Sequence, residues 1–205
     1  AAQAEKGGLF NDAIQLYQEH LEVFPDDQDA MLRLAEVLRQ GTPDAQRIEY
    51  ATNLYERYLD RFGSNEKVRD QLTEIYMKRD AFSRARPHLE TLVRSNGGNP
   101  TYAFYLGRCQ EAMGDLNPAV ESYRKAVAAD QKDAPHRLET FSRLAVLLRK
   151  KSNRSDEADA LIDQMVRSDP NNYRAYLERG NYYYELYRLN LGDRAKNLKS
   201  AADDF

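Results

Sequence analysis

The side chains with the most reactive chemistry are few and scattered along this chain. Cys109 is the only cysteine in 205 residues, so neither an intrachain disulfide nor a thiolate cluster can form, and cysteine usage does not set the compartment. His20, His88 and His136 lie far apart, and no two of them share a helix face at i, i+4 spacing. We therefore expect Cys109 to be a small buried residue, and each histidine to be a surface or packing residue rather than a metal ligand.

Sequence motifs for catalysis are also missing. The chain contains no G-x-x-x-x-G-K-S/T, no G-x-S-x-G and no H-E-x-x-H. Its acidic residues form no pattern that differs from solvated helix faces, and no apolar run approaches the ~20 residues of a membrane span. The sequence predicts no enzyme activity, no catalytic residues, no metal site, no cofactor and no membrane insertion in this chain.

Aromatic residues gather near the carboxyl end, and their chemistry allows two interpretations. The tyrosines of this segment are Tyr173, Tyr176, Tyr182, Tyr183, Tyr184 and Tyr187. Such rings could stack on the bases of single-stranded RNA. However, the formal net charge is −3 and the basic residues alternate with acidic ones, whereas phosphate binding favours a basic stripe. We expect no nucleic-acid partner, and assign the tyrosines to helix packing or to contacts with protein.

A regular series of alanines indicates the elements that position these side chains. Ala51, Ala85 and Ala119 are spaced by 34 residues, and Ala13 and Ala158 extend the series at intervals of 38 and 39. After each alanine an aromatic or aliphatic residue follows at the fourth position, and further apolar residues follow one helical turn later. A period of 34 built on helical spacing is typical of stacked helix pairs.

The segment before each alanine repeats as well, and the two halves together resemble a known family. The best unit combines Leu106-Gly107 with Ala119 and Tyr123. It is similar to the tetratricopeptide repeat, with its consensus W-x-x-L-G-x-x-Y, then A-x-x-x-F, then P. The chain departs from this consensus in having no tryptophan, and in having Gln110 where tyrosine is usual. The resemblance implies an all-α fold, a right-handed α-α superhelix (solenoid) of about five to six antiparallel helix pairs.

Small residues explain why the helices of one pair can approach closely. In the fourth unit Gly107 is expected to face Ala119, which allows the helix axes to come within the ~8–10 Å of tight packing. In the final unit Ala201 takes the place of the series alanine, and Phe205 follows four residues later. We expect the larger residues at helical spacing to fill the gap to the next unit.

We interpret residues 1–205 as one array, truncated at both ends of a longer protein. The expected units are 1–27, 28–65, 66–99, 100–133, 134–172 and 173–205. Only Ala1–Lys6 would remain of the helix before Ala13. The longer intervals predict inserted residues at Gly41–Tyr50, Asp133–Glu139 and Leu186–Asn197, which either carry binding or are neutral variation in loops.

The resemblance also implies a concave groove lined by the first helix of each pair. It points to Leu32, Arg33, Glu36 and Arg39 in the second unit and to Asp70, Gln71, Glu74 and Lys78 in the third. In the fourth unit it points to Glu111, in the fifth to Ser142, Val146 and Lys150, and in the sixth to Leu177, Glu178 and Glu185. The residues expected to bind a partner are Phe104, Tyr105, Arg108, Arg143, Arg149, Asn181 and Tyr184. Exposed aromatic rings would anchor a peptide, and the arginines would suit an acidic or C-terminal carboxylate segment. Alternatively, Phe104 and Tyr105 pack on the adjacent repeat.

Taken together, these patterns predict a non-catalytic protein–protein interaction scaffold that binds a peptide or protein in its groove. The alternative is a regulatory or scaffolding arm of a larger enzyme whose catalytic domain lies outside this chain. Self-association through uncapped ends is a third hypothesis. The residues do not match the pattern with which related repeats clamp the C-terminal carboxylate of heat-shock chaperones, so we do not expect that activity.

Overall fold

The computed structural model describes residues 9–40, 43–129, 133–150 and 154–205, and all regular structure in these ranges is helical. The chain divides into two compact units, Ala1–His88 and Leu89–Phe205. The all-α class and the helix pairs of an α-solenoid are confirmed. The right-handed superhelix and the continuity of one array concern the chain as a whole, and they stay predictions.

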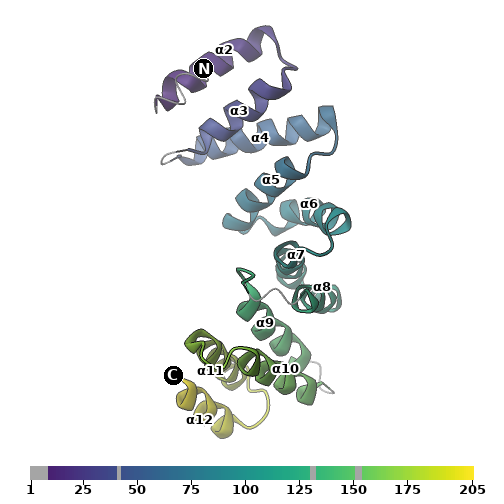
Figure 1. The fold of residues 1–205 in the computed structure, drawn as a ribbon, viewed down its shortest axis with the longest axis vertical. Helices are drawn as coiled ribbons and strands as arrows, with labels where there is room; N and C mark the ends of the chain where they lie inside the picture. The colour runs from purple at the N-terminus through teal and green to yellow at the C-terminus, as the bar shows by residue number, and fades with distance from the viewer. Residues whose placement is uncertain (1–8, 41–42, 130–132, 151–153) are drawn as a thin grey trace. The chain divides into compact units, whose positions relative to one another are not determined.

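The first unit consists of paired helices with well-defined starts (Figure 1). Its helices are α2 (Phe10–Val23), α3 (Gln28–Leu38), α4 (Ala45–Phe62), α5 (Glu66–Lys78) and the start of α6 (Phe82–Ser95). The side chains of Asp27, Asp44 and Asn65 accept backbone hydrogen bonds at the starts of α3, α4 and α5. Most of the predicted insertion at Gly41–Tyr50 is helical, because α4 begins at Ala45; residues 41 and 42 lie outside the described ranges.

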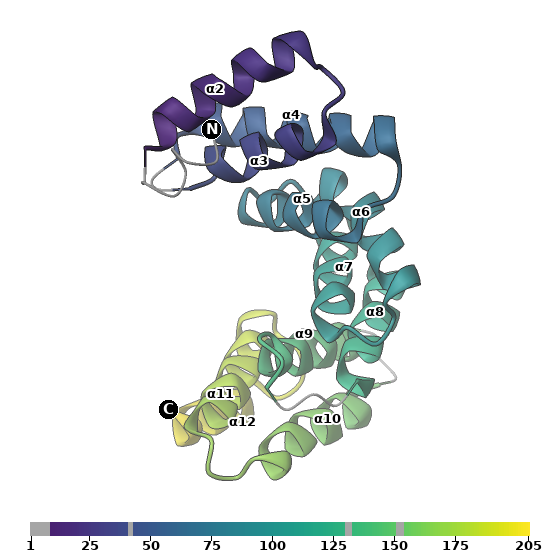
Figure 2. The ribbon, with the colours of Figure 1, turned by 45° about the horizontal axis from the view of Figure 1, so that its top comes forward.

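The second unit contains the last part of α6 and three complete helix pairs (Figure 2). Its helices are α7 (Pro100–Ala112), α8 (Leu116–Ala128), α9 (Arg137–Lys150), α10 (Ser155–Ser168), α11 (Tyr173–Arg188) and α12 (Arg194–Asp204). α7 packs on α8, α9 on α10 and α11 on α12, while α9 also contacts α8 and α11. The first helices α9 and α11 therefore lie beside each other and form one wall of this unit.

The alanine series marks the closest helix contacts in both units. Ala13, Ala51, Ala85, Ala119 and Ala158 are all completely buried. A methyl group is the largest side chain that allows two helix backbones to approach this closely, so these positions bring the core together. Ala201 is 1% exposed and extends the series into α12, as predicted.

Two glycines make the same contact in two different repeats, which confirms the register. A Cβ atom on Gly107 would lie 2.6 Å from the ring of Tyr123, and a Cβ atom on Gly180 would lie 2.7 Å from the ring of Phe205. In each case the ring belongs to the aromatic residue four positions after a series alanine. The glycine on the first helix thus provides the space that this ring occupies on the second.

Three helix pairs turn with the same backbone conformation. Asp80, Gly114 and Asn190 have φ angles of 52°, 82° and 56°. At each turn the following residue donates its N–H to a carbonyl five residues earlier, as in the bond from the Asp115 N–H to the Gln110 carbonyl. This is the Schellman ending of an α-helix, in which a left-handed residue satisfies the last carbonyl groups.

The expectation of a buried Cys109 is confirmed, and two prolines lie in the first turns of their helices. The Asn99 side chain caps α7 by accepting a hydrogen bond from the Thr101 N–H, with Pro100 at the first helical position. Pro118 lies in the first turn of α8, and Cys109 is fully buried. The expectation for Ala1–Lys6 falls outside the described residues.

Candidate functional site

Phe104 packs within the second unit and does not lie on an open surface. It is 1% exposed, and its ring stacks on His136 with centroids 4.4 Å apart and an angle of 11° between the planes. Its predicted role as an exposed anchor is therefore wrong, and the alternative of packing on the adjacent repeat describes it correctly. Tyr105 is half-buried, with its hydroxyl 2.9 Å from Nε2 of His136. Arg108 is half-buried, and its charge acts on His136 and lowers the pKa of that imidazole beyond the larger effect of burial.

Arg143 is held by carboxylates from two helices. Its Nε donates to Glu139 at 2.8 Å on α9, and its Nη1 donates to Glu111 at 3.2 Å on α7. Burial alone would lower the pKa of Arg143, but the hydrogen bond to Glu139 and the nearby acidic groups raise it. Burial also raises the pKa of Tyr123, whose hydroxyl stays protonated and donates to Glu111. The guanidinium of Arg143 thus connects α7 to α9.

Arg149 points away from the expected groove and joins three helices. Its Nη1 donates to Asp159 of α10 at 2.8 Å, and the hydroxyl of Tyr182 on α11 donates to the other oxygen of Asp159, also at 2.8 Å. The backbone of Gly192 also lies close to Arg149, so that a Cβ atom on Gly192 would lie 2.9 Å from Nη2 of Arg149. The side chain of Arg149 is only 17% exposed. Its predicted role in partner binding is replaced by a structural one.

A groove of about 290 Å³ lies among the first helices of the three pairs. We call it the α9–α11 groove. It is lined by Glu111 from α7, by Glu139, Ser142, Arg143, Val146 and Lys150 from α9, and by Glu178, Asn181, Tyr182 and Glu185 from α11. Both the α9 and the α11 set follow the spacing i, i+3, i+4, i+7, because side chains at these positions share one face of a helix. Two helix faces therefore meet as opposite walls.

The α9–α11 groove contains only some of the residues that the sequence predicted for binding. Arg143 and Asn181 line it, and Asn181 is exposed. Tyr184 is 45% exposed, but it is not among the lining residues and stacks instead near Tyr187 on its own helix, with ring centroids 6.2 Å apart. Sequence reasoning missed Glu139 and Tyr182 as lining residues. The position of Glu139 four residues before Arg143 was the available signal, since such pairs form ion pairs on a helix.

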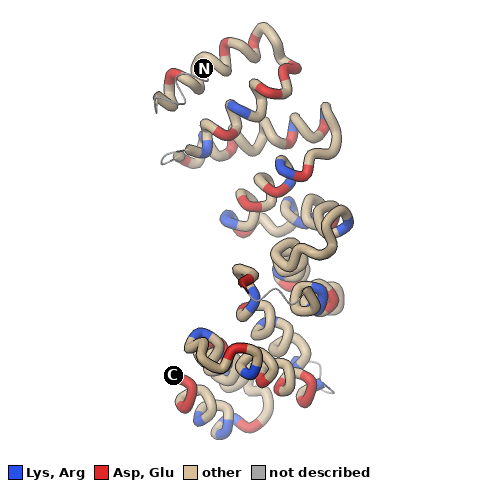
Figure 3. Tube along the Cα trace, in the orientation of Figure 1, with Lys and Arg blue, Asp and Glu red and all other residues tan. Residues whose placement is uncertain are grey.

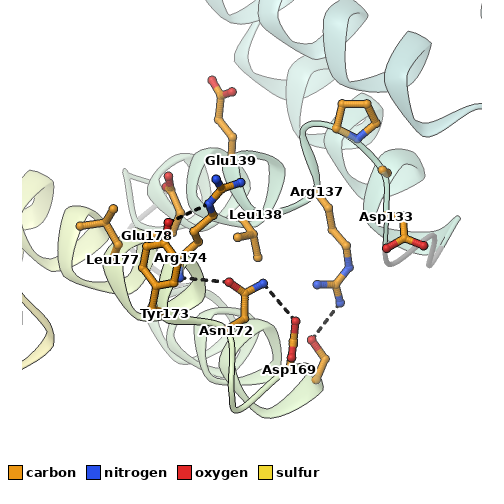
Figure 4. Close-up of a pocket in the computed structure, with 13 residues that line it drawn as sticks. Asp133, Arg137, Leu138, Glu139, Asp169, Asn172, Tyr173, Arg174, Leu177 and Glu178 are labelled. Atoms are coloured by element: carbon orange, nitrogen blue, oxygen red, sulfur yellow. Dashed lines mark hydrogen bonds between the residues drawn. The ribbon is translucent and has the colours of Figure 1, made fainter.

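A second hollow of about 520 Å³ continues the groove toward the starts of α9 and α11 (Figure 4). We call it the rim hollow, and it shares Glu139 and Glu178 with the α9–α11 groove. Figure 4 shows Arg137 reaching Ser168, to which its Nη2 donates at 2.8 Å. The other arginine that lines the rim hollow is Arg174, and its Nε donates to the hydroxyl of Tyr173 at 3.3 Å. The cations of the rim hollow are thus already bound to neighbouring side chains.

The charges in both units are mixed. Figure 3 shows Lys and Arg alternating with Asp and Glu along the helices. In the described part of the chain, no three His, Cys, Asp or Glu side chains are grouped so that they could hold a metal ion. None of the described helices combines the length and the apolar character required to cross a membrane.

Comparison with known families agrees with the helix pairs. The family model of the tetratricopeptide repeat matches residues 3–65 and 74–134. The chain belongs to the tetratricopeptide repeat family. Among curated proteins, no sequence matches it. Members of this family bind proteins or peptides and are typically non-catalytic, so the chain falls in the class of protein-interaction scaffolds.

Several solved structures of tetratricopeptide repeat proteins share the fold. MamA from AMB-1 is 21% identical, with a TM-score of 0.65 over 83% of this chain and 88% of that one. MamA from Desulfovibrio magneticus RS-1 is 16% identical, with a TM-score of 0.59 over 82% and 92%. YrrB, described as a TPR protein with an unusual peptide-binding site, is 19% identical, with a TM-score of 0.64 over 92% and 91%. At these identities the likeness shows the fold alone.

Within this family, the floor of the α9–α11 groove gives it a mixed character. Val146 is half-buried between the two helices, and Tyr182 is almost fully buried beneath the groove. Ser142 and Asn181 add hydroxyl and amide groups to the walls. A concave surface with an apolar floor and a few polar groups can bind a side chain of a partner and orient it at the same time.

Proposed function

We propose that this chain is a non-catalytic interaction scaffold that holds a peptide segment of a partner protein in the α9–α11 groove. The main support for the proposal is the groove, an open hollow between two first helices that is lined by the half-buried Val146 and by the exposed Asn181. The chemistry of the lining supports binding more than catalysis, since the hydroxyl of Ser142 and the guanidinium of Arg143 are engaged with neighbouring carboxylates.

Family membership and one structural relative support this assignment. Tetratricopeptide repeats bind proteins or peptides as a family. YrrB, which has the same fold, is described as a TPR protein with an unusual peptide-binding site. Binding in the groove, rather than on the outer faces of α8, α10 and α12, is the specific part of the proposal.

The test is to fill the groove with one bulky side chain. Asn181 is exposed and lines the groove, so Asn181→Trp should obstruct it without disturbing the core. Gln164→Trp provides the control, because Gln164 is exposed on α10 and is not among the residues that line the groove. Peptides selected from a randomised library on the unmodified protein would be titrated against both variants by fluorescence polarisation.

We expect Asn181→Trp to weaken binding by about tenfold or more, because steric exclusion from a central contact costs at least ~1.4 kcal/mol. Gln164→Trp should bind like the unmodified protein. Equal binding by all three proteins would place the site outside the groove and contradict the proposal.

A further inference from the structure

The lining of the α9–α11 groove carries more acidic than basic side chains. The basic residues of the lining are Arg143 and Lys150, and the acidic ones are Glu111, Glu139, Glu178 and Glu185. Arg143 is already bound to two of these carboxylates, at 2.8 and 3.2 Å. With Lys150 counted, the lining keeps a net charge of −2, and the ion pairs of Arg143 involve neither Glu178 nor Glu185.

The two carboxylates of the α11 wall have weak partners. Glu178 accepts a hydrogen bond from the hydroxyl of Ser142 at 3.1 Å, which is a neutral donor. Glu185 pairs with Arg188 of the same helix at 3.2 Å, but the Arg188 side chain is 60% exposed. Exposed ion pairs of this kind contribute little, because water and salt screen them. A cation supplied by a partner can therefore bind these carboxylates at little cost.

The floor of the groove matches the rest of such a side chain. Lysine and arginine combine a cationic head group with a flexible hydrocarbon stem, and they bury the stem on apolar surface. Val146 lines the same groove as Glu178 and Glu185 and offers that surface. An acidic side chain in this position would face carboxylates on both walls.

We infer that the partner segment bound in the α9–α11 groove is basic, and that it places lysine or arginine side chains along the groove, with their stems on Val146 and their cationic groups at Glu178 and at Glu185, which lie two turns apart on α11. This inference rests on the proposed function and specifies its partner. It reverses the sequence-based expectation of an acidic or carboxylate segment, because Arg143 and Arg149 are both committed to acidic residues of this chain.

The experiment compares the charge of selected peptides with the effect of removing the carboxylates. A randomised peptide library would be selected on the unmodified protein, and the enriched peptides sequenced and synthesised. Binding would then be measured for Glu178→Gln/Glu185→Gln and for a control, Glu121→Gln/Asp203→Asn. The control removes the same two negative charges from exposed positions on α8 and α12.

The expected result is enrichment of lysine and arginine in the selected peptides. Glu178→Gln/Glu185→Gln should bind the selected peptides about tenfold or more weakly, because each substitution removes a charge-assisted hydrogen bond to the peptide. The control should stay within about twofold, since distant surface charges are screened. Binding of the unmodified protein should also weaken as salt is added.

Two results would overturn the inference in different ways. If the enriched peptides are neutral or acidic, or bind equally to Glu178→Gln/Glu185→Gln, while Asn181→Trp still blocks them, the groove binds peptides but the basic partner is wrong. If no peptide is enriched, or if Asn181→Trp leaves binding intact, both the basic partner and the proposed function are wrong.

Discussion

At the scale of single residues, the smallest side chains of this protein decide how its helices pair. Gly107 and Gly180 leave space for the rings of Tyr123 and Phe205, and a Cβ at either glycine would lie 2.6–2.7 Å from the ring. Tyr123 cannot move aside easily, because it is fully buried and its hydroxyl donates to Glu111 at 2.7 Å. The close contact is therefore sensitive to any increase in size on the first helix.

We predict that Gly107→Leu lowers the free energy of unfolding by about 1–3 kcal/mol or more, because the added side chain overpacks the α7–α8 contact. Gly98→Leu serves as the control, since a Cβ at Gly98 would meet no atom within 4 Å. Urea denaturation of both variants provides the measurement. Equal stability of Gly107→Leu and the unmodified protein would show that the repeat register is wrong.

Single residues also show the limits of sequence reasoning about the groove. Phe104 and Arg149 both lie on helices that contribute to the second unit, yet neither side chain is available for binding. Phe104 stacks on His136, which lies just before α9, and Arg149 reaches Asp159 on α10. The partner of Phe104 comes from the next repeat and that of Arg149 from the second helix of its own pair, so no pattern within one helix could identify them.

At the scale of helices, α12 depends on a small set of contacts with α11. Arg179 of α11 donates from Nε and Nη2 to the two oxygens of Asp204, at 2.8 and 2.6 Å. The Asp204 side chain is only 6% exposed. Such a bidentate pair fixes the direction of both side chains. Together with Ala201 and the ring of Phe205 against Gly180, it holds α12 in place.

We predict that Arg179→Met detaches α12. Removing one partner of a buried pair typically costs about 3–5 kcal/mol, but a terminal helix can unfold locally and reduce that cost. Amide hydrogen exchange should therefore become faster in α12 while α7 and α8 keep their protection. The control is Arg188→Met, because Arg188 forms only an exposed pair with Glu185. Unchanged exchange in α12 would mean that Ala201 and Phe205 suffice to hold it.

At the scale of the whole molecule, histidines in both units link stability to pH. Burial lowers the pKa of His88 and of His136 below the usual 6.5. Neighbouring arginines, Arg69 and Arg84 at His88 and Arg108 at His136, act in the same direction, whereas nearby carboxylates oppose it. The unfolded chain therefore binds protons at these imidazoles more readily than the folded protein does.

We predict that the free energy of unfolding is greatest above pH ~6.5 and decreases as the pH falls toward ~5, because protons then favour the unfolded chain. The carboxyls with lowered pKa, Asp27 and Glu74, lose their contribution only at lower pH, from usual values of 3.8 and 4.5. Urea denaturation across this range measures the effect. In His88→Gln/His136→Gln the decrease should be smaller, and an equal decrease in both proteins would contradict the assignment.

Much of this architecture follows from the sequence, because repeated local spacing fixes which residues share a helix face. The alanine series recurs along the chain, and the Gly107–Tyr123 contact and the cap at Asn99 involve residues of one helix pair or of one helix. Only the tertiary structure decided how the polar residues of the second unit are used. The pairing of Arg143 and Arg149, and the burial of Phe104, depend on which neighbouring helix lies within reach. The spacing along the chain indicates the pair of Arg143 with Glu139, whereas the contacts of Arg143 with Glu111 and of Arg149 with Asp159 depend on how neighbouring helices pack.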